Sequence, residues 1–225
     1  VCVLRHVPFE GPGILTDVLQ QRGVTQSVRD VPVDPDWESA ALGADLLVIL
    51  GGPISANQTE LFPWLAREWE VARRRIADDR PLLGVCLGAQ IMARALGVSV
   101  QPGAVEIGWK PVLLTPQGRA SVLAPLDGLP VLHWHGDHIS ETVDLPSLAA
   151  TDLGPMQAFA RGRALGLQFH LEVEAAALEA WYVGHTVELG ARGVSVKDLR
   201  RETARFAPHL APKARTVCNN WLDSL

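Results

Sequence analysis

Two uninterrupted apolar runs constrain the fold of this chain more than any other feature. They are Asp45–Leu50 (DLLVIL) and Pro81–Val85 (PLLGV), and a glycine-containing stretch breaks the pattern at each of them. Strands that are buried on both faces have such continuous apolar runs, whereas half-exposed strands alternate apolar with polar residues. Helix-forming segments follow at Leu61–Ala77 and Leu87–Leu96. Strands that alternate with helices predict an α/β protein with a mostly parallel sheet covered by helices on both faces.

The rest of the chain continues this alternation. Pro208 and Pro212 are expected to break the last helix, because proline has no amide hydrogen to donate. No internal repeat or linker divides the 225 residues, so we predict a single domain over residues 1–225. Its core would span about residues 1–174, with a helical C-terminal extension over 175–225. The further strands are expected at Val1–Leu4, Val131–Trp134, Met156–Phe159 and Ala164–Phe169, and the further helices at Ile14–Arg22, Glu174–Leu189 and Lys197–Leu225.

Composition and charge limit the classes of partner. The formal net charge is −5, and the short basic cluster Arg73–Arg75 falls on a predicted helix, where a solvated face explains it. Nucleic-acid binding is therefore not expected. The cysteines, Cys2, Cys86 and Cys218, are odd in number and far apart, which indicates a reducing compartment rather than a disulfide framework. No apolar run is long enough to cross a bilayer and no leader pattern opens the chain, so we expect a cytoplasmic protein without membrane attachment.

Three chemically distinctive groups come directly after predicted strands. They are the glycine stretch Gly51–Pro53, the thiol of Cys86 and the imidazole of His170. In an open parallel sheet, ligands bind outside the carboxyl ends of the strands. If these strands are parallel neighbours, a glycine loop, a thiol and an imidazole meet at one edge of the sheet.

Cys86 has the spacing of a nucleophile elbow, Gly84-x-Cys86-x-Gly88. We expect the glycines to permit a sharp strand-to-helix turn. The helix that starts near Leu87 would direct its free amides and the positive end of its dipole to the sulfur, which favours the thiolate. Taken alone, a core cysteine between a strand and a helix explains the same pattern.

His170 and Glu172 are two residues apart in a predicted extended segment, where alternate side chains project to the same side. The carboxylate can therefore hold one imidazole nitrogen while the other faces the thiol, as nucleophile, base and orienting acid require. Taken alone, such a pair is common at solvated strand ends. A backbone amide of the glycine stretch and the amide of Leu87 would supply an oxyanion hole, although an ordinary turn also explains Gly51–Pro53.

The motifs LGGP, GVCLGAQ, HGD and LGLQFHLEVE, in this order, resemble those of class I glutamine amidotransferases, in particular the glutaminase domain of GMP synthetase and its free-standing relatives. The resemblance runs from about Val1 to about Glu174 and implies a flavodoxin-like fold. Leu171 departs from it, because proline is usual between the histidine and the glutamate. The resemblance implies that Cys86 is the nucleophile, His170 the base and Glu172 the acid that orients it. It also implies that the amides of Gly52 and Leu87 bind the oxyanion. The implied substrate contacts are Gln90, His135, Gly136 and Asp137.

The resemblance implies cleavage of a γ-glutamyl amide through a Cys86 thioester that water resolves, without a cofactor. The first hypothesis is glutamine hydrolysis that delivers ammonia to a separate synthetase or acceptor subunit, because the sequence has no phosphate-binding loop and no ATP-dependent domain after Glu174. The second is a γ-glutamyl peptidase with the same three residues, and the third is a non-catalytic binding subunit. Phe62, Trp64 and Trp109 are expected near the rim, where they would wall the exit of the leaving group, cradle an amine or only pack.

A competing pattern is HWHGDH, which has the His-x-His-x-Asp-His spacing of metallo-β-lactamase-like zinc hydrolases. Its members are His133, His135, Asp137 and His138. We rank this hypothesis lower, because the amidotransferase resemblance already accounts for this strand end and the zinc reading leaves GVCLGAQ and FHLE unexplained. No metal is therefore expected.

Overall fold

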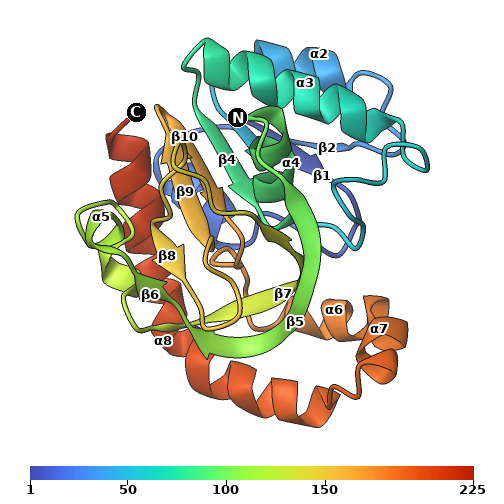
Figure 1. Cartoon of the computed structure of the whole chain (residues 1–225), viewed down its shortest axis with the longest axis vertical. Coiled ribbons are helices and arrows are strands. Elements are labelled where there is room, and N and C mark those ends of the chain that lie inside the picture. Colours follow the sequence, from blue (N-terminus) through green and yellow to red (C-terminus); the bar gives the residue numbers. More distant parts are fainter.

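The two apolar runs lie side by side at the centre of an eight-stranded sheet in the computed structural model, which describes residues 1–225 (Figure 1). The strand order is β2-β1-β3-β4-β10-β9-β8-β6. All pairings from β2 to β10 are parallel, and those from β10 to β6 are antiparallel. The strands are β1 (Cys2–Arg5), β2 (Ser27–Asp30), β3 (Leu47–Ile49), β4 (Leu82–Val85), β6 (Leu113–Leu114), β8 (Ala149–Ala150), β9 (Ala158–Arg161) and β10 (Ala164–Leu167).

Two long strands, β5 (Val100–Pro111) and β7 (Pro130–Ile139), form a separate antiparallel ribbon beside this sheet. Figure 1 shows β5 and β7 curving across the lower part of the molecule, between the main sheet and the C-terminal helices. An isolated bridge between Leu132 and His170 ties the ribbon to the segment that follows β10. The carboxyl ends of the central strands therefore face this ribbon.

Helices cover both faces of the parallel half of the sheet, as the apolar runs predicted. In β3, Val48 packs into the apolar cluster on one face, while Leu47 and Ile49 pack into the cluster on the other. The first face is covered by α1 (Ile14–Gln21) and α8 (Val196–Asp223), and the second by α2 (Trp37–Gly43), α3 (Trp64–Ala77) and α4 (Leu87–Ala95). The remaining helices are α5 (Pro116–Arg119), the 3-10 turn η1 (Ala124–Leu126), α6 (Leu178–Gly184) and α7 (Thr186–Ala191).

The expected break at Pro208 and Pro212 is wrong, because both prolines lie inside the continuous helix α8. Each proline removes one helical hydrogen bond and costs about 3 kcal/mol in a helix interior. Both prolines are exposed, whereas the opposite side of α8 is buried against the core. Burial of this apolar face offsets the lost bonds, since tertiary packing supplies most helix stability in proteins. No helix in the structure combines the length and the apolar character that crossing a membrane requires.

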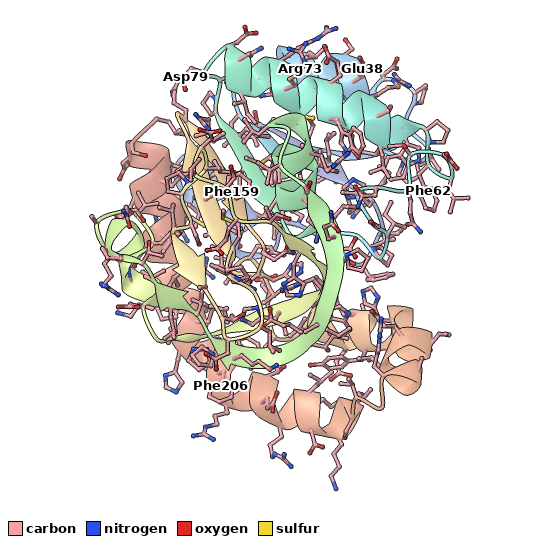
Figure 2. The ribbon with its side chains drawn as sticks, in the orientation of Figure 1. Glu38, Phe62, Arg73, Asp79, Phe159 and Phe206 are labelled. Carbon is pink, nitrogen blue, oxygen red and sulfur yellow. The ribbon has the colours of Figure 1, made fainter.

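The expected solvated arginine cluster is only partly correct. Arg73 and Arg74 are exposed and pair with Glu70, and Figure 2 shows Arg73 on the outer side of α3. Arg75 is instead 1% exposed, and its guanidinium donates to four backbone carbonyls near the ends of α2, β3 and β4. Burial lowers its pKa to about 10. Arg75 therefore fixes chain turns behind the sheet and does not form a binding surface.

Candidate functional site

Cys86 lies between β4 and α4 in a backbone conformation that non-glycine residues rarely adopt, with φ 52° and ψ −109°. Such strained residues persist only where the surrounding structure fixes them, and they concentrate at functional sites. The positive φ is that of Cys86 itself, and the flanking glycines permit the turn because they have no side chains. A Cβ at Gly84 would collide with the backbone of Gly88, and a Cβ at Gly88 would collide with the Ile49 carbonyl. The glycines therefore allow the elbow to pack closely on β3.

His170 and Glu172 form the pair that their spacing predicted. The His170 Nδ1 is 2.7 Å from the Glu172 Oε1, and both side chains are buried. Burial alone would lower the pKa of His170, but the charges of Glu172 and Cys86 and hydrogen bonds to both side chains raise it well above its ordinary value. Because Nδ1 is engaged by the carboxylate, Nε2 is the nitrogen available to the thiol.

Backbone contacts hold this pair from two sides. The His170 amide donates to the Leu132 carbonyl at 2.8 Å, and the Ile14 amide at the start of α1 donates to the Glu172 carbonyl at 2.8 Å. Gly13, with φ 46°, packs so closely on that carbonyl that any side chain would collide with it. The glycine before α1 is therefore required by the position of Glu172.

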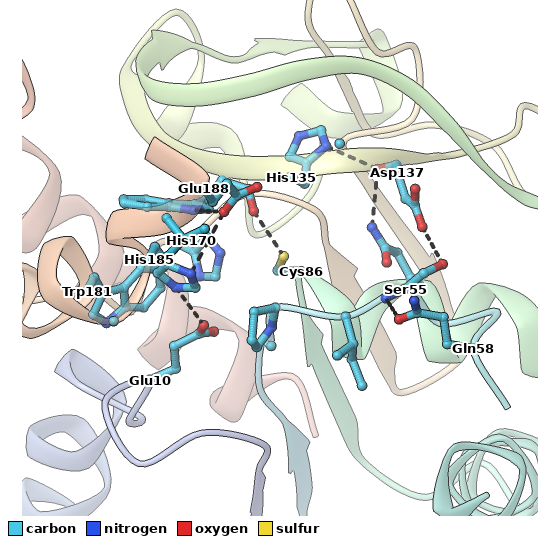
Figure 3. A pocket seen from close by; sticks show the side chains of 18 of the residues that line it. Glu10, Ser55, Gln58, Cys86, His135, Asp137, His170, Trp181, His185 and Glu188 are labelled. Atoms are coloured by element: carbon cyan, nitrogen blue, oxygen red, sulfur yellow. Dashed lines mark hydrogen bonds and ion pairs between the residues drawn. The ribbon is translucent and has the colours of Figure 1, made fainter. Parts of the chain in front are cut away.

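Cys86 and His170 line one pocket of about 520 Å³. Figure 3 shows Cys86 at its centre, with Ser55, Gln58 and Asp137 on one side and Trp181, His185 and Glu10 on the other. The thiol donates to the Trp134 carbonyl at 3.6 Å. This volume is within the range of about 300–1,000 Å³ that small-molecule sites have.

One of the two expected oxyanion donors borders the same pocket. Gly52 lines it, and Leu87 is the first residue of α4, where amides lack an acceptor within the helix. A Cβ built at Gly51 would lie 2.5 Å from a Glu10 carboxylate oxygen and 3.0 Å from the His170 ring. The glycine loop thus runs directly against the imidazole, with no room for a side chain.

The expected substrate contacts form the other wall of the pocket. The Gln90 amide nitrogen donates to the Asp137 carbonyl at 3.2 Å, and the His135 Nδ1 donates to the same carbonyl at 3.1 Å. The Asp137 carboxylate accepts a hydrogen bond from Ser55. Gly136 lines the pocket between His135 and Asp137. All four predicted residues therefore gather beside Cys86.

A sequence profile of the family described as glutamine amidotransferase class-I matches residues 14–183. The chain belongs to this family. It is 32% identical over 181 residues to the glutamine amidotransferase-like protein YfeJ of Salmonella typhimurium, covering 77% of this chain and 76% of that protein. It is 33% identical over 166 residues to the glutamine-hydrolysing GMP synthase of Thermomicrobium roseum, covering 67% of this chain but only 29% of the synthase. The chain thus spans less than a third of that relative.

The fold is that of solved members of the class I family. A glutamine amidotransferase from Thermotoga maritima superposes with a TM-score of 0.86 at 28% identity, covering 98% of this chain and 96% of that one. A second, from Methylobacillus flagellatus, gives a TM-score of 0.88 at 26% identity, covering 100% and 94%. Both likenesses extend beyond the motifs and include the C-terminal helices.

Sequence reasoning missed the half of the pocket built by α6, α7 and the loop after β1. Trp181 packs its ring edge-on against His170, with the ring centroids 4.9 Å apart. The His185 Nε2 is 3.2 Å from a Glu10 oxygen, and the indole of Trp134 donates to Glu188 at 3.1 Å. Trp181, His185 and Glu188 recur at a helical spacing within the expected helix Glu174–Leu189, but nothing local pairs them with Glu10 or Trp134, which come from other segments. Only their aromatic and acidic character, unusual in a helical extension, could have drawn attention to them.

The expectation for the bulky rim residues is wrong, because Phe62, Trp64 and Trp109 do not line the pocket. Trp109 is buried under α8, where its indole donates to Thr203 at 2.9 Å. Trp64 stacks on His6, with ring centroids 5.5 Å apart, and Phe62 packs on Trp64. All three have the packing role that was left open as the alternative.

The ligand set of the zinc reading is not assembled. The only group of three potential ligands that the structure brings together is Glu106, His135 and His138, with ligand atoms within 4.8 Å of one another. His133 is fully buried outside this group, and burial lowers its pKa to about 4. The Asp137 carboxylate pairs with Ser55. The motif spacing therefore does not predict which of its residues converge.

Proposed function

We propose that this chain hydrolyses the side-chain amide of glutamine through a thioester on Cys86, releasing glutamate and ammonia. The observation that carries the proposal is the strained turn at Cys86 beside the buried His170–Glu172 pair. Membership of the class I family supports action on the glutamine amide in general. Such a pair beside a thiol supplies a base, and an acid that orients it, to a nucleophile.

In the first step, the Cys86 sulfur attacks the amide carbon and His170 holds the thiol proton. The amide oxygen becomes an oxyanion, for which the amides of Gly52 and Leu87 are the proposed donors. Each donor of this kind is worth about 3–4 kcal/mol of transition-state stabilisation. His170 then passes its proton to the departing nitrogen, so that ammonia leaves and the thioester remains.

In the second step, water attacks the thioester carbon while His170 accepts a proton from it. The carbon–sulfur bond breaks, the proton returns to the sulfur and glutamate is released. Glu172 keeps Nδ1 protonated throughout, so that Nε2 is free to exchange protons with the thiol, the leaving nitrogen and the water. No cofactor takes part in this sequence.

The two sides of the pocket are proposed to bind different parts of the substrate, the glutamyl half and the leaving group. The proposed contacts to the glutamyl half are Gln90, His135, Gly136 and Asp137. Because His170 must protonate the departing nitrogen, the leaving group lies on the side of Trp181 and His185. We further propose that the chain acts as one domain in the cytoplasm and passes ammonia to a separate acceptor enzyme.

Alkylation with a glutamine-mimicking diazoketone tests the nucleophile. We expect stoichiometric labelling of Cys86, located by peptide mass mapping, and no turnover of glutamine by Cys86→Ala. Cys218 provides an internal control, because burial raises its pKa to about 12 and leaves it unreactive. Labelling of Cys218, or full activity of Cys86→Ala, would contradict the mechanism.

A substrate panel tests the leaving group. Glutamate release is measured from glutamine and from γ-glutamyl peptides, without and with an extract of the source cell. We expect slow hydrolysis of glutamine by the isolated chain and faster hydrolysis when the acceptor enzyme is present. Much more efficient cleavage of a γ-glutamyl peptide, with no partner needed, would replace the glutaminase with a peptidase.

A further inference from the structure

Behind the glycine loop lies a buried imidazole–carboxylate pair that the mechanism above does not use. His6 follows β1, and Glu68 lies on α3; they are 7% and 0% exposed. The His6 Nε2 is 3.1 Å and 3.3 Å from the two Glu68 oxygens, and its Nδ1 is 2.8 Å from the Gly51 carbonyl oxygen. Neither side chain lines the pocket. The pair therefore reaches the pocket only through the glycine loop.

The contact with Gly51 fixes the orientation of the next amide. The chain contains no cis peptide bond, so the Gly51 carbonyl and the Gly52 N–H point to opposite sides of their shared peptide plane. With the carbonyl directed at His6, the N–H is directed away from His6. A Cβ at Gly51 would meet Glu10, His170 and Cys86, so the loop lies directly beside the proposed catalytic groups.

A peptide between two glycines needs such an external contact. Glycine has no Cβ to restrict its backbone, so this peptide can rotate more readily than any other in the site. Rotation by half a turn would present the Gly51 carbonyl oxygen where the oxyanion forms. The oxyanion would then lose a hydrogen-bond donor and would also be repelled by the partial negative charge of the carbonyl oxygen.

Both partners of the His6 ring, the Gly51 carbonyl and the Glu68 carboxylate, are acceptors, so each ring nitrogen must carry a proton. A carbonyl oxygen can only accept, so Nδ1 must be protonated to bond Gly51. Burial alone would lower the pKa of His6, but the Glu68 charge and the hydrogen bonds to Glu68 and Gly51 raise it. Without Glu68, a neutral imidazole could place its single proton on Nε2 and leave a lone pair facing the carbonyl. Trp64, stacked on the ring at an interplanar angle of 20°, limits its rotation.

We propose that the Glu68–His6 pair is a positioning device that keeps the Gly51–Gly52 peptide turned so that the Gly52 N–H serves as an oxyanion donor. This inference rests on the proposed glutaminase function. Neither residue touches the substrate, and the effect passes through one main-chain carbonyl. His6 and Glu68 should therefore affect the rate of the chemical step more than substrate binding.

Two pairs of variants separate positioning from packing. Asparagine places an amide nitrogen near the position of Nδ1, whereas glutamine reaches toward the position of Nε2, so His6→Asn is the rescue variant and His6→Gln the loss variant. Glu68→Leu removes the partner of Nε2, whereas the amide of Glu68→Gln can donate to Nε2 of a neutral imidazole, whose single proton then stays on Nδ1. Circular dichroism and melting curves identify folded variants, and the Glu68 pair decides the matter if His6→Gln does not fold.

We expect His6→Gln and Glu68→Leu to lower kcat for glutamine by about 100- to 1,000-fold, the effect of losing one oxyanion donor, with little change in KM. His6→Asn and Glu68→Gln should retain most of the activity. Iodoacetamide displaces iodide without forming an oxyanion, so its rate of reaction with Cys86 should be the same in all four variants.

Two results would overturn the inference. One is unchanged kcat in folded His6→Gln and Glu68→Leu. The other is an equal loss in all four variants with a raised KM and slower alkylation of Cys86, which describes a packing defect. If the unaltered chain does not hydrolyse glutamine with any partner, the proposed function fails and the inference fails with it. Normal hydrolysis by all the variants refutes the positioning role alone.

Discussion

Replacing Glu172 with glutamine changes one charge and almost no volume, which makes it the sharpest test of how His170 is controlled. The carboxylate lies 2.7 Å from Nδ1 and is one of the charges that raise the pKa of His170. Glutamine keeps an oxygen that can accept from Nδ1 and removes the negative charge. The second carboxylate oxygen is buried with no hydrogen-bond partner, so no other contact is lost there.

The expected loss follows from this geometry. A hydrogen bond to a charged group contributes about 1.5–3 kcal/mol, and each 1.36 kcal/mol is a factor of ten in rate. Glu172→Gln should therefore lower kcat by roughly 10- to 150-fold and leave measurable hydrolysis. The loss would approach about 10⁴-fold only if the amide turned its nitrogen toward the ring and forced the other tautomer. His170→Ala, which removes the base itself, should reduce turnover to background.

Glutamate release from saturating glutamine measures kcat for each variant, and a melting curve confirms that each is folded. Glu174→Gln is the matched control, because Glu174 is an exposed carboxylate two residues further along the same segment. It should behave as the unaltered chain does. Complete loss in folded Glu172→Gln, equal to that in His170→Ala, would show that Glu172 has a role other than orienting the imidazole. No loss at all would remove it from the mechanism.

Three further predictions concern stability and metal. Gly88→Ala should destabilise the fold by about 1–3 kcal/mol or more in urea titrations, because its Cβ meets the Ile49 carbonyl, whereas Gly190→Ala, in open space within α7, should be neutral or stabilising. His133 is held neutral down to about pH 4, so the unfolded chain binds its proton first as the pH falls from about 6.5. The free energy of unfolding should therefore decrease over that range by up to about 3 kcal/mol more in the unaltered chain than in His133→Leu, and an equal decrease would refute the assignment. Elemental analysis should find no tightly held zinc, and chelators should leave activity unchanged; one zinc per chain with activity lost on chelation would restore the zinc hydrolase reading.

Local spacing was sufficient for the parts of the site that lie close together in sequence. The apolar runs predicted the parallel strands, and a separation of two residues in an extended segment predicted the contact between His170 and Glu172. Cys86 could be placed at the end of a strand because the run before it is apolar and the segment after it is helical. These inferences need only the period of a strand and the position of a turn.

Features that depend on tertiary packing were not predictable in the same way. Burial of the apolar face of α8 keeps the helix continuous through its two prolines. Backbone carbonyls near the ends of three elements accept hydrogen bonds from the buried Arg75. Glu10 and His185 are 175 residues apart, and no local pattern pairs them. The same holds for His6 and Glu68, which resemble an ordinary strand end and an ordinary helix face until the fold joins them.

Main-chain contacts help to fix each of the three proposed catalytic residues. The start of α1 holds the Glu172 carbonyl, β7 holds the His170 amide, and close packing of α4 on β3 holds the turn at Cys86. The glycine loop differs, because a side chain, that of His6, holds its carbonyl. Each of these contacts joins two elements of the parallel half of the sheet or its ribbon. A change that loosens that half should therefore reduce activity before it unfolds the chain, because sub-ångström errors in position are sufficient to impair a catalytic constellation.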